Sequence, residues 1–328
     1  MPFFSIITPT YNRASLLVET IKSVLDQTYK DYELIIVDDG SPDNTKQAVE
    51  PFLSDKIKYF YQPNKRQGAA RNLGMRNASG EFVTFLDHDD LWSPLFLETY
   101  YRFIQGKPDT QWVHSPFFWF NENYYWKGTV YPVEGWLWKY LLKGNLINTL
   151  TIAVRRKLLE NVKFDESPLI WPSEDWEFNF RLSIASPCYF QPLPMLFMRN
   201  HITRTSATTQ LIQMEKAYFF ALDKIIQNPF MDDKPAHLKR SALSHGHLFI
   251  AENAYGRNLQ GQLMKHTIKA ATIYPFILFT KRWSSLFIKI FIPAFLRNKL
   301  RNLKQHYLAK EIKDPQSIIR LPRVLDHL

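Results

Sequence analysis

The first ninety residues alternate between short runs of β-forming apolar residues and longer segments with helical periodicity. Strands are expected at 3–8, 32–37, 56–61 and 82–86, and helices at 14–27, 44–53 and 67–78. Strands joined by helices of this length run parallel, because each crossover returns the chain to the same edge of the sheet. The pattern therefore predicts an α/β fold with a parallel central sheet and flanking helices.

The pattern is looser after Pro94. Helices are expected at 95–105 and 173–184, and strands at 111–120 and 149–154. Ser173 is expected to cap the second of these helices, with two acids in its first turn. Strand signals disappear after about Ser206, so we expect one domain over 1–206, with halves 1–90 and 91–206, and a helical region over 207–328.

Positive charge is concentrated at the C-terminal end of the chain. From residue 281 onward there are 11 Lys or Arg against 3 Asp or Glu, although the whole chain carries a net charge of only +10. Leu296, Leu300, Leu303 and Tyr307 recur at helical spacing among basic residues. An amphipathic basic helix suits an anionic membrane surface, but packing on the rest of the chain with solvated charges is an equal alternative. No motif for nucleic-acid binding is recognised.

Cys188 is the only cysteine, which excludes an internal disulfide and a cysteine-based zinc site. The first strand pattern begins at Phe3, which leaves no room for a signal peptide. No apolar run reaches the roughly 20 residues that a bilayer span requires. We therefore expect a cytoplasmic location, peripheral on the inner face of the membrane if the basic helix binds lipid.

Polar residues follow three of the expected parallel strands, at 9–12, 38–41 and 87–90. The carboxyl ends of parallel strands lie at one edge of the sheet, so these loops should share a crevice. The acids of the third loop repel one another and are stabilised by a bound cation. A basic helix start at 64–72 adds a site for a phosphorylated ligand. The alternative for 87–90 is a polar turn that ends the strand.

The motifs together resemble those of the family-2 glycosyltransferases, which have the GT-A fold. The resemblance rests on 5–12 (SIITPTYN), 37–41 (VDDGS), 68–72 (GAARN), 85–90 (FLDHDD, with its Asp-x-Asp motif) and the acidic pair Glu174-Asp175. Their order and spacing match over residues 3 to about 206. The resemblance implies a GT-A domain, with a nucleotide-binding half at 1–90 and an acceptor half at 91–206, followed by the helical region.

The resemblance also implies roles for individual residues. The donor nucleotide sugar would be bound by Pro9, Tyr11, Asn12, Asp39, Arg71 and Asp87, of which the first three line the nucleotide pocket. Asp89 would hold Mg²⁺ or Mn²⁺ at the diphosphate, with His201 completing the metal shell. Asp175 would be the base that removes the proton of the acceptor hydroxyl.

The expected activity is a metal-dependent, inverting transfer of one sugar from a nucleoside diphosphate sugar, most simply a UDP-sugar, to a hydroxyl of a glycan or glycolipid. Such a reaction would serve surface polysaccharide or glycolipid assembly. Residues 279–283 (FTKRW) resemble the Gln-x-x-Arg-Trp signature of processive sugar polymerases, but Phe279 stands where glutamine belongs. We therefore expect single transfers.

Several alternatives remain at this point. Asp39 could stabilise a turn, the acidic pair could serve only a helix dipole, and His201 could be structural. A module that binds nucleotide sugars without catalysis would keep the same motifs. A sugar-1-phosphate nucleotidyltransferase would need a glycine-rich loop after the first strand, and residues 9–13 contain no glycine.

Overall fold

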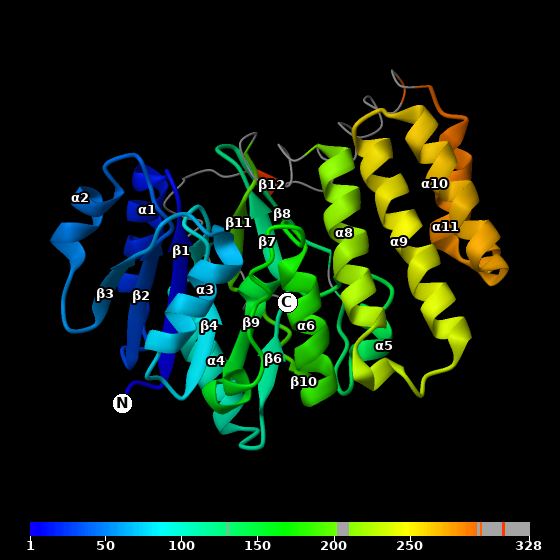
Figure 1. Cartoon of the computed structure of the whole chain (residues 1–328). Helices are drawn as coiled ribbons and strands as arrows, with labels where there is room; N and C mark the ends of the chain where they lie inside the picture. Colours follow the sequence, from blue (N-terminus) through cyan, green and yellow to red (C-terminus); the bar gives the residue numbers. More distant parts are fainter. Residues whose placement is uncertain (130, 202–209, 294–295, 297–309, 312–328) are drawn as a thin grey trace.

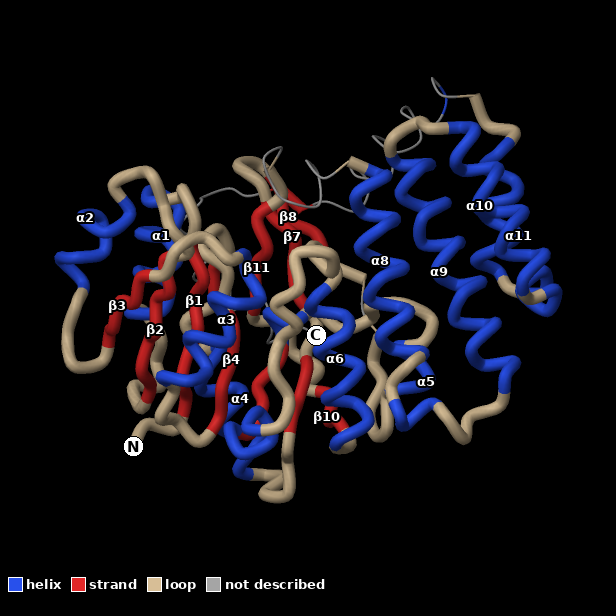
Figure 2. Tube along the Cα trace, in the orientation of Figure 1, coloured by secondary structure: helices blue, strands red, loops and turns tan. Residues whose placement is uncertain are grey.

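The computed structural model describes residues 1–129, 131–201, 210–293, 296 and 310–311. Figures 1 and 2 show an α/β part built on a central sheet, with a stack of helices against one end of it. The chain thus has the predicted mostly parallel sheet and the predicted helical C-terminal region. The expected boundary at residue 206 lies outside the described residues.

Seven strands form the central sheet, in the order β10 (Cys188–Phe190), β6 (Trp112–His114), β9 (Ile152–Arg155), β4 (Phe82–Phe85), β1 (Phe4–Thr10), β2 (Tyr32–Asp38) and β3 (Ile57–Tyr61). The first four strands along the chain pair in parallel, with Ile6 opposite Leu34 on one side and Thr84 on the other. β9 runs antiparallel to both of its neighbours. The prediction of a parallel sheet is confirmed for the half of the chain from which it was made.

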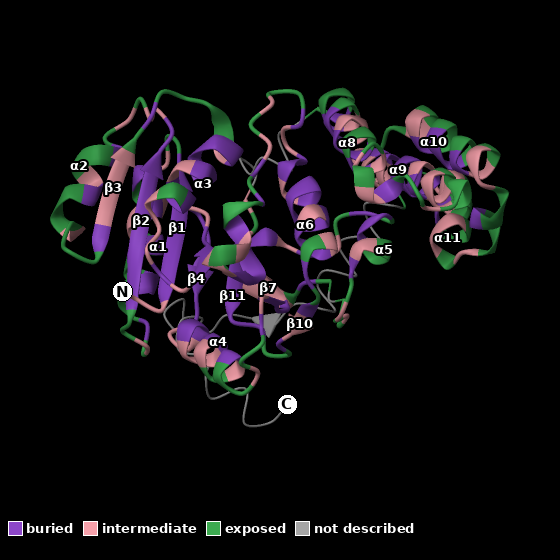
Figure 3. Ribbon diagram, turned by 60° about the horizontal axis from the view of Figure 1, so that its bottom comes forward, coloured by how far each residue is buried: buried purple, intermediate pink, exposed green. Residues whose placement is uncertain are grey.

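Helices cover the sheet, so its middle strands are buried, as Figure 3 shows for β1 and β2. The first half contributes α1 (Ala14–Leu25), α2 (Thr45–Val49), η1 (Glu50–Phe52) and α3 (Arg66–Asn77), and the second half begins with β5 (Leu91–Trp92) and α4 (Phe96–Gln105). A strand buried on both faces favours apolar side chains at most positions, which explains the mostly apolar runs; buried polar residues such as Ser5 and Glu33 bond each other. α3 lies close to β1 at Gly74: a Cβ added to this glycine would lie only 2.4 Å from Ile7 Cγ2.

A second sheet differs from what the sequence predicts. It contains β12 (Lys310–Glu311), β8 (Tyr124–Lys127), β7 (Phe117–Phe120), β11 (Leu196–Arg199) and β5 (Leu91–Trp92), in that order. The single strand expected at 111–120 is wrong: β6 and β7 belong to different sheets. Pro116 lies between them, and a proline cannot donate a hydrogen bond to a sheet.

Residues expected as one strand at 149–154 also divide, into η2 (Thr149–Thr151) and β9, while η3 (Arg156–Glu160) follows. Asn148 accepts a hydrogen bond from the backbone N–H of Leu150, which stabilises the turn before β9. Near the acidic pair, α5 (Trp138–Leu141) packs against α6 (Glu174–Ala185).

The C-terminal region is helical, as expected, over most of its described residues. It contains α8 (Leu211–Ile226), η4 (Pro229–Met231), α9 (Ala236–Gly256), α10 (Gln260–Ile273), η5 (Pro275–Phe279) and α11 (Lys281–Ile290). The ring of Tyr218 stacks between Trp176 of α6 and Phe249 of α9, with centroids 4.3 and 4.4 Å away. One core therefore joins the two parts of the chain.

The described end of the chain contains a strand. β12 pairs with β8 in a region expected to be helical, because backbone pairing along an existing strand needs little sequence signal. The amphipathic basic helix expected at 296–307 lies outside the described residues except for Leu296. Among the described residues, no helix combines the length and apolar content that crossing a bilayer demands.

Candidate active site

A cavity of about 810 Å³ opens beyond the carboxyl ends of β1, β2 and β4. The expected site residues that line it are Pro9, Tyr11, Asp39, Arg71, Asp87, Asp89, Asp175 and His201. Loops from both halves of the α/β part and side chains from α8 and α9 enclose the same space. The cavity thus gathers residues that lie up to 192 positions apart in the sequence. The carboxyl ends of parallel strands account for Pro9, Tyr11, Asp39, Asp87 and Asp89, but not for Asp175 and His201.

Asn12 is the expected residue that does not line the cavity. Its backbone adopts a left-handed conformation (φ 54°), and its N–H donates to Ser41 Oγ at 3.0 Å. This turn follows β1, which continues to Thr10, two residues beyond its expected end. The structure thus places Asn12 in the turn beside the cavity and not among the residues that line it, and its role in donor binding stays a prediction.

Asp39 lies at the end of β2 and is buried. Its Oδ1 accepts hydrogen bonds from Gln62 Nε2 at 2.7 Å and from the backbone N–H of Lys65 at 2.9 Å. The turn itself is held by Asp38, whose Oδ1 accepts the N–H of Ser41 at 2.8 Å. Asp38 therefore stabilises the turn, whereas the adjacent Asp39 faces the cavity.

The loop after β4 carries a cluster of carboxylates. Asp87, Asp89 and Asp90 each present an oxygen, and these oxygens lie within 4.8 Å of one another. His201 Nε2 lies 2.8 Å from Asp89 Oδ2, and Asp90 Oδ1 accepts the backbone N–H of Arg199 at 2.7 Å. Hard oxygen donors with one imidazole suit Mg²⁺ or Mn²⁺, so the residues present fit a divalent cation. Asp90 had no role from the sequence, although its place in the acidic run is a signal.

Arg71 connects this cluster to the acidic pair at the start of α6. Its Nη2 donates to Asp87 Oδ1 at 2.9 Å, and its Nη1 lies 3.8 Å from Glu174 Oε1. Arg71 Nε and Glu174 Oε2 are buried and make no hydrogen bond to any residue that the structure describes. A buried polar atom without a partner is costly, so both atoms are suited to contact a ligand in the cavity.

Asp175 is held from two sides. Asn145 Nδ2 donates to Asp175 Oδ2 at 3.0 Å, and the N–H of Trp176 donates to Asp175 Oδ1 at 2.8 Å. Asn145 in turn lies near Asn179, whose Nδ2 also donates to the carbonyl of Ile147 at 2.9 Å. No sequence signal pointed to Asn145, because only the fold brings its loop to α6.

Ser173 occupies the cap position of α6, but its side chain makes no capping hydrogen bond. The expected Ser173 cap is therefore wrong. Asp175 accepts an N–H of the first turn instead. Glu174 and Asp175 both line the cavity although they are adjacent on the helix.

The acidic pair has perturbed proton affinities. Burial and the neighbouring Asp175 carboxylate raise the pKa of Glu174 to about 7, against the partial compensation of Arg71. Burial also raises the pKa of Asp175, and the Asn145 hydrogen bond opposes that rise. Raised carboxyl pKa values of this kind occur where burial prepares a group for proton transfer.

Replacing Glu174 by glutamine is expected to flatten the pH dependence of stability. Because the folded pKa of Glu174 exceeds its unfolded value, its stabilising contribution is present below about pH 4.5 and is lost as pH rises through about 7. Without metal, the free energy of unfolding of the wild type should lose up to about 3 kcal/mol through this group between pH 5 and pH 8. Urea unfolding across that range measures the difference.

The matched control is Glu177→Gln, in the same helical turn, whose carboxylate pairs with Arg181 at 2.6 Å instead of facing the cavity. It should retain the wild-type decline between pH 5 and pH 8. A Glu174→Gln curve parallel to that of the wild type would show that burial does not perturb Glu174.

Aromatic and basic side chains line another wall. The guanidinium of Arg66 lies over the ring of Trp171, 4.5 Å from its centroid, and both residues line the cavity. Met214 of α8 and Phe249 and Asn253 of α9 also line it. The C-terminal region therefore contributes directly to the site.

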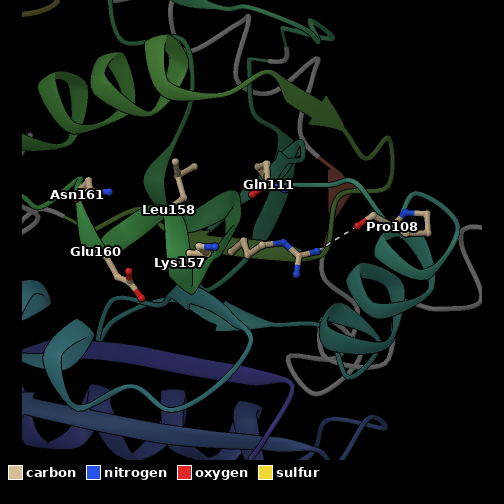
Figure 4. Close-up of a pocket in the computed structure, with 7 residues that line it drawn as sticks. Pro108, Gln111, Lys157, Leu158, Glu160 and Asn161 are labelled. Carbon is tan, nitrogen blue, oxygen red and sulfur yellow. Dashed lines mark hydrogen bonds between the residues drawn. The ribbon is translucent and has the colours of Figure 1, made fainter.

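A second hollow, of about 550 Å³, contains none of the expected site residues (Figure 4). Arg155 extends along it and donates to the carbonyls of Pro108 and Thr110, each at 3.2 Å. Its guanidinium also pairs with Glu81 at 2.5 Å. Arg155 thus stabilises the loop before β6, so we interpret the polar contacts in this hollow as structural.

The chain is similar to known glycosyltransferases in sequence and in fold. The family model described as Glycosyl transferase family 2 matches residues 5–162. A glycosyltransferase of Rickettsia typhi is 30% identical over 279 residues, which cover 79% of this chain and 83% of the relative. A segment of 94 residues is 50% identical to the GalNAc(5)-diNAcBac-PP-undecaprenol β-1,3-glucosyltransferase of Campylobacter jejuni, and covers 27% of this chain.

The chain spans under a third of the length of some curated relatives that it matches. The share is 30% for the Campylobacter jejuni enzyme and 29% for a glycosyltransferase of Rickettsia conorii that is 34% identical over 178 residues.

Two solved structures are similar to the whole arrangement. S. aureus TarS 1–349 in complex with UDP-GlcNAc has a TM-score of 0.62 and 20% identity, and the match covers 86% of this chain and 83% of the TarS 1–349 chain. The mannosyltransferase PcManGT of Pyrobaculum calidifontis, in complex with GDP-Man and Mn²⁺, has a TM-score of 0.55 and 17% identity, with coverages of 92% and 87%. At these identities the likeness shows a shared fold.

Proposed function

The chain is a glycosyltransferase of family 2 with the GT-A fold, and on that premise we propose that it transfers one sugar, with inversion, from a nucleoside diphosphate sugar to an acceptor hydroxyl. The observation that carries the proposal is the meeting of Asp39, Asp87, Asp89 and Asp175 around one cavity, with Asp90 beside Asp87 and Asp89. The family match removes the nucleotidyltransferase alternative.

The proposed donor is a UDP-sugar. Support comes from the similarity to TarS, which was solved with UDP-GlcNAc. In this proposal Asp39 accepts a hydrogen bond from the base, and Pro9 and Tyr11 line the nucleotide pocket. Arg71 and Asp87, already paired with each other, contact ribose or sugar hydroxyls.

The proposed metal site consists of Asp87, Asp89 and Asp90 with His201. A bound Mg²⁺ or Mn²⁺ would neutralise the charge that develops on the leaving diphosphate. The Asp89–His201 contact holds β11 and the loop after β4 together at this point. Similarity to PcManGT, solved with Mn²⁺, supports the proposal.

Asp175 is proposed as the base that takes the proton from the acceptor hydroxyl. The hydrogen bonds from Asn145 and Trp176 fix the orientation of its carboxylate. Its raised pKa makes it a better proton acceptor than an exposed aspartate. Because the attacking oxygen arrives from the side opposite to the leaving diphosphate, the anomeric carbon inverts.

The proposed acceptor is the hydroxyl of a glycan, carried on a lipid or forming part of a surface polysaccharide. The support is the similarity to the Campylobacter jejuni enzyme, whose name includes an undecaprenol-linked glycan. We also propose that 1–90 binds the nucleotide and 91–206 the acceptor. Met214, Phe249 and Asn253 would extend the acceptor side into the helical region.

The direct test is to incubate the full chain with a panel of nucleotide sugars, with and without Mn²⁺, and to measure thermal stabilisation and donor hydrolysis. The proposal expects stabilisation by one UDP-sugar and slow, metal-dependent release of UDP. Stabilisation without hydrolysis or transfer would favour a binding module without catalysis.

Replacing Asn145 by alanine is expected to reduce kcat by about tenfold or more, because a hydrogen bond to a charged group is lost. Without that bond the pKa of Asp175 should rise further, so the acidic limb of the kcat profile should move to higher pH. Steady-state kinetics at several pH values measure both effects. A lower kcat with an unmoved limb would contradict the assignment of Asn145 as a positioning residue.

A further inference from the structure

The end of the helical region has an unusual charge composition. Between Glu252 and Glu311 there is no Asp or Glu, whereas the same segment contains 11 Lys or Arg. Among the described residues, Lys265 and Lys269 of α10 and Lys281 of α11 are exposed. These helices therefore carry exposed positive charge and no acids of their own, although Glu252 of α9 pairs with Arg282.

The same elements, and the residue that follows α11, expose large apolar side chains. Apart from Met1, the three most exposed large apolar residues of the described chain are Phe279 (87%), Phe291 (73%) and Phe276 (68%). Further exposed members on the same elements are Met264, Ile268, Leu278, Phe287 and Ile288. We call these residues, with Lys265, Lys269 and Lys281, the basic apolar face.

The inner sides of these elements already have their packing partners. Leu263 and Ala270 of α10, Ile277 of η5 and Leu286 of α11 are buried in the main core. The rings of Trp283, Phe287 and Phe291 contact in sequence along α11, with centroids 4.9 and 5.5 Å apart. The exposed apolar residues are thus additional to the core, and such patches mark interaction surfaces.

Figure 1 places α10 and α11 at the outer edge of the helical stack, at the opposite end of the molecule from α2 and β3. Figure 3 shows exposed positions along α10 and α11 from another side. The elements that carry the basic apolar face therefore lie at the outer edge of the described molecule.

We propose that the basic apolar face docks on an anionic membrane surface. Phenylalanine side chains enter the boundary between headgroups and acyl chains, while lysines contact anionic headgroups. A second copy of the chain fits less well, because a symmetric contact would bring two positively charged faces together. The proposal rests on residues 264–291 and does not involve the expected helix at 296–307.

The test uses the full chain and sedimentation with vesicles of phosphatidylcholine alone, or of an equal mixture with phosphatidylglycerol. We expect binding to the anionic vesicles only, weakened by added salt. Phe276→Ser with Phe279→Ser should weaken binding by about tenfold or more, since each lost phenylalanine removes apolar burial in the interface. Lys269→Glu with Lys281→Glu should have an effect of similar size.

Matched controls come from the opposite end of the molecule. Leu53 and Lys46 are exposed beside and on α2, and Leu53→Ser and Lys46→Glu should leave vesicle binding unchanged. Circular dichroism confirms folding, and Phe291→Ser provides a second apolar variant if the double variant is unstable.

Three outcomes would overturn the proposal. The first is an absence of binding to anionic vesicles. The second is binding that the phenylalanine and lysine variants leave unchanged. The third is a dimer of the wild type, seen by light scattering, that the phenylalanine variants abolish. The vesicles contain no sugar donor or acceptor. A negative result in the vesicle test therefore does not contradict the proposed sugar transfer, and a negative result in the transfer assay does not contradict membrane binding.

Discussion

Replacing Asp175 by asparagine should lower kcat by about 10²–10⁴-fold while leaving donor affinity close to that of the wild type. Asparagine retains the shape of the side chain and can keep its contact with Asn145, but it cannot accept a proton at neutral pH. The measurements are steady-state transfer kinetics and calorimetric binding of UDP and the UDP-sugar.

Glu177→Gln is the control for this substitution, because it removes another carboxylate from the first turn of α6. If the acids of this turn served only the helix dipole, the two variants would behave alike. The base assignment therefore requires that Asp175→Asn loses turnover and Glu177→Gln keeps it. Equal, small effects would remove Asp175 as the base.

Replacing Asp89 by asparagine should reduce both Mn²⁺ affinity and transfer by at least about 100-fold, since even outer partners of metal ligands contribute 10- to 100-fold. EDTA should likewise abolish transfer by the wild type. Titration of free Mn²⁺ followed by electron paramagnetic resonance measures the affinity without relying on turnover.

Asp55→Asn provides the control, because Asp55 is an exposed aspartate after η1 that does not line the cavity. This variant should bind Mn²⁺ as the wild type does. Full activity in the presence of chelator, or wild-type Mn²⁺ affinity in Asp89→Asn, would show that the cluster is not the metal site. In that case the Asp89–His201 contact would be purely structural.

The central sheet could be predicted because its signal is local. Each strand from β1 to β4 is a short run of mostly apolar, β-forming residues, and parallel pairing follows from the helices between them. Bringing Asp39 and Asp87 to one edge of the sheet follows from that topology alone. The position of Asp175 in the same cavity followed only from the family resemblance, because no local pattern joins α6 to β4.

Other features depended on contacts between distant segments. The division of 111–120 into strands of two sheets required neighbours that the segment itself does not specify, namely β9 for β6 and β11 for β7. Asn145, Arg66 and Phe249 have no motif, and they became visible as site residues only when the cavity was formed. The raised pKa of Glu174 depends on burial, which no residue type encodes.

The sequence by itself thus determined the strand order along the chain, the parallel half of the sheet and the family, because periodicity and short motifs are carried by neighbouring residues. Tertiary structure alone decided which groups meet: Arg71 with Asp87 and Glu174, Asn145 with Asp175, and Asp89 with His201. It also decided that the phenylalanines of η5 and α11 remain outside the core. Contacts and burial depend on how segments that are remote in the sequence pack together. The pattern of residues along the chain does not specify the distances between those segments.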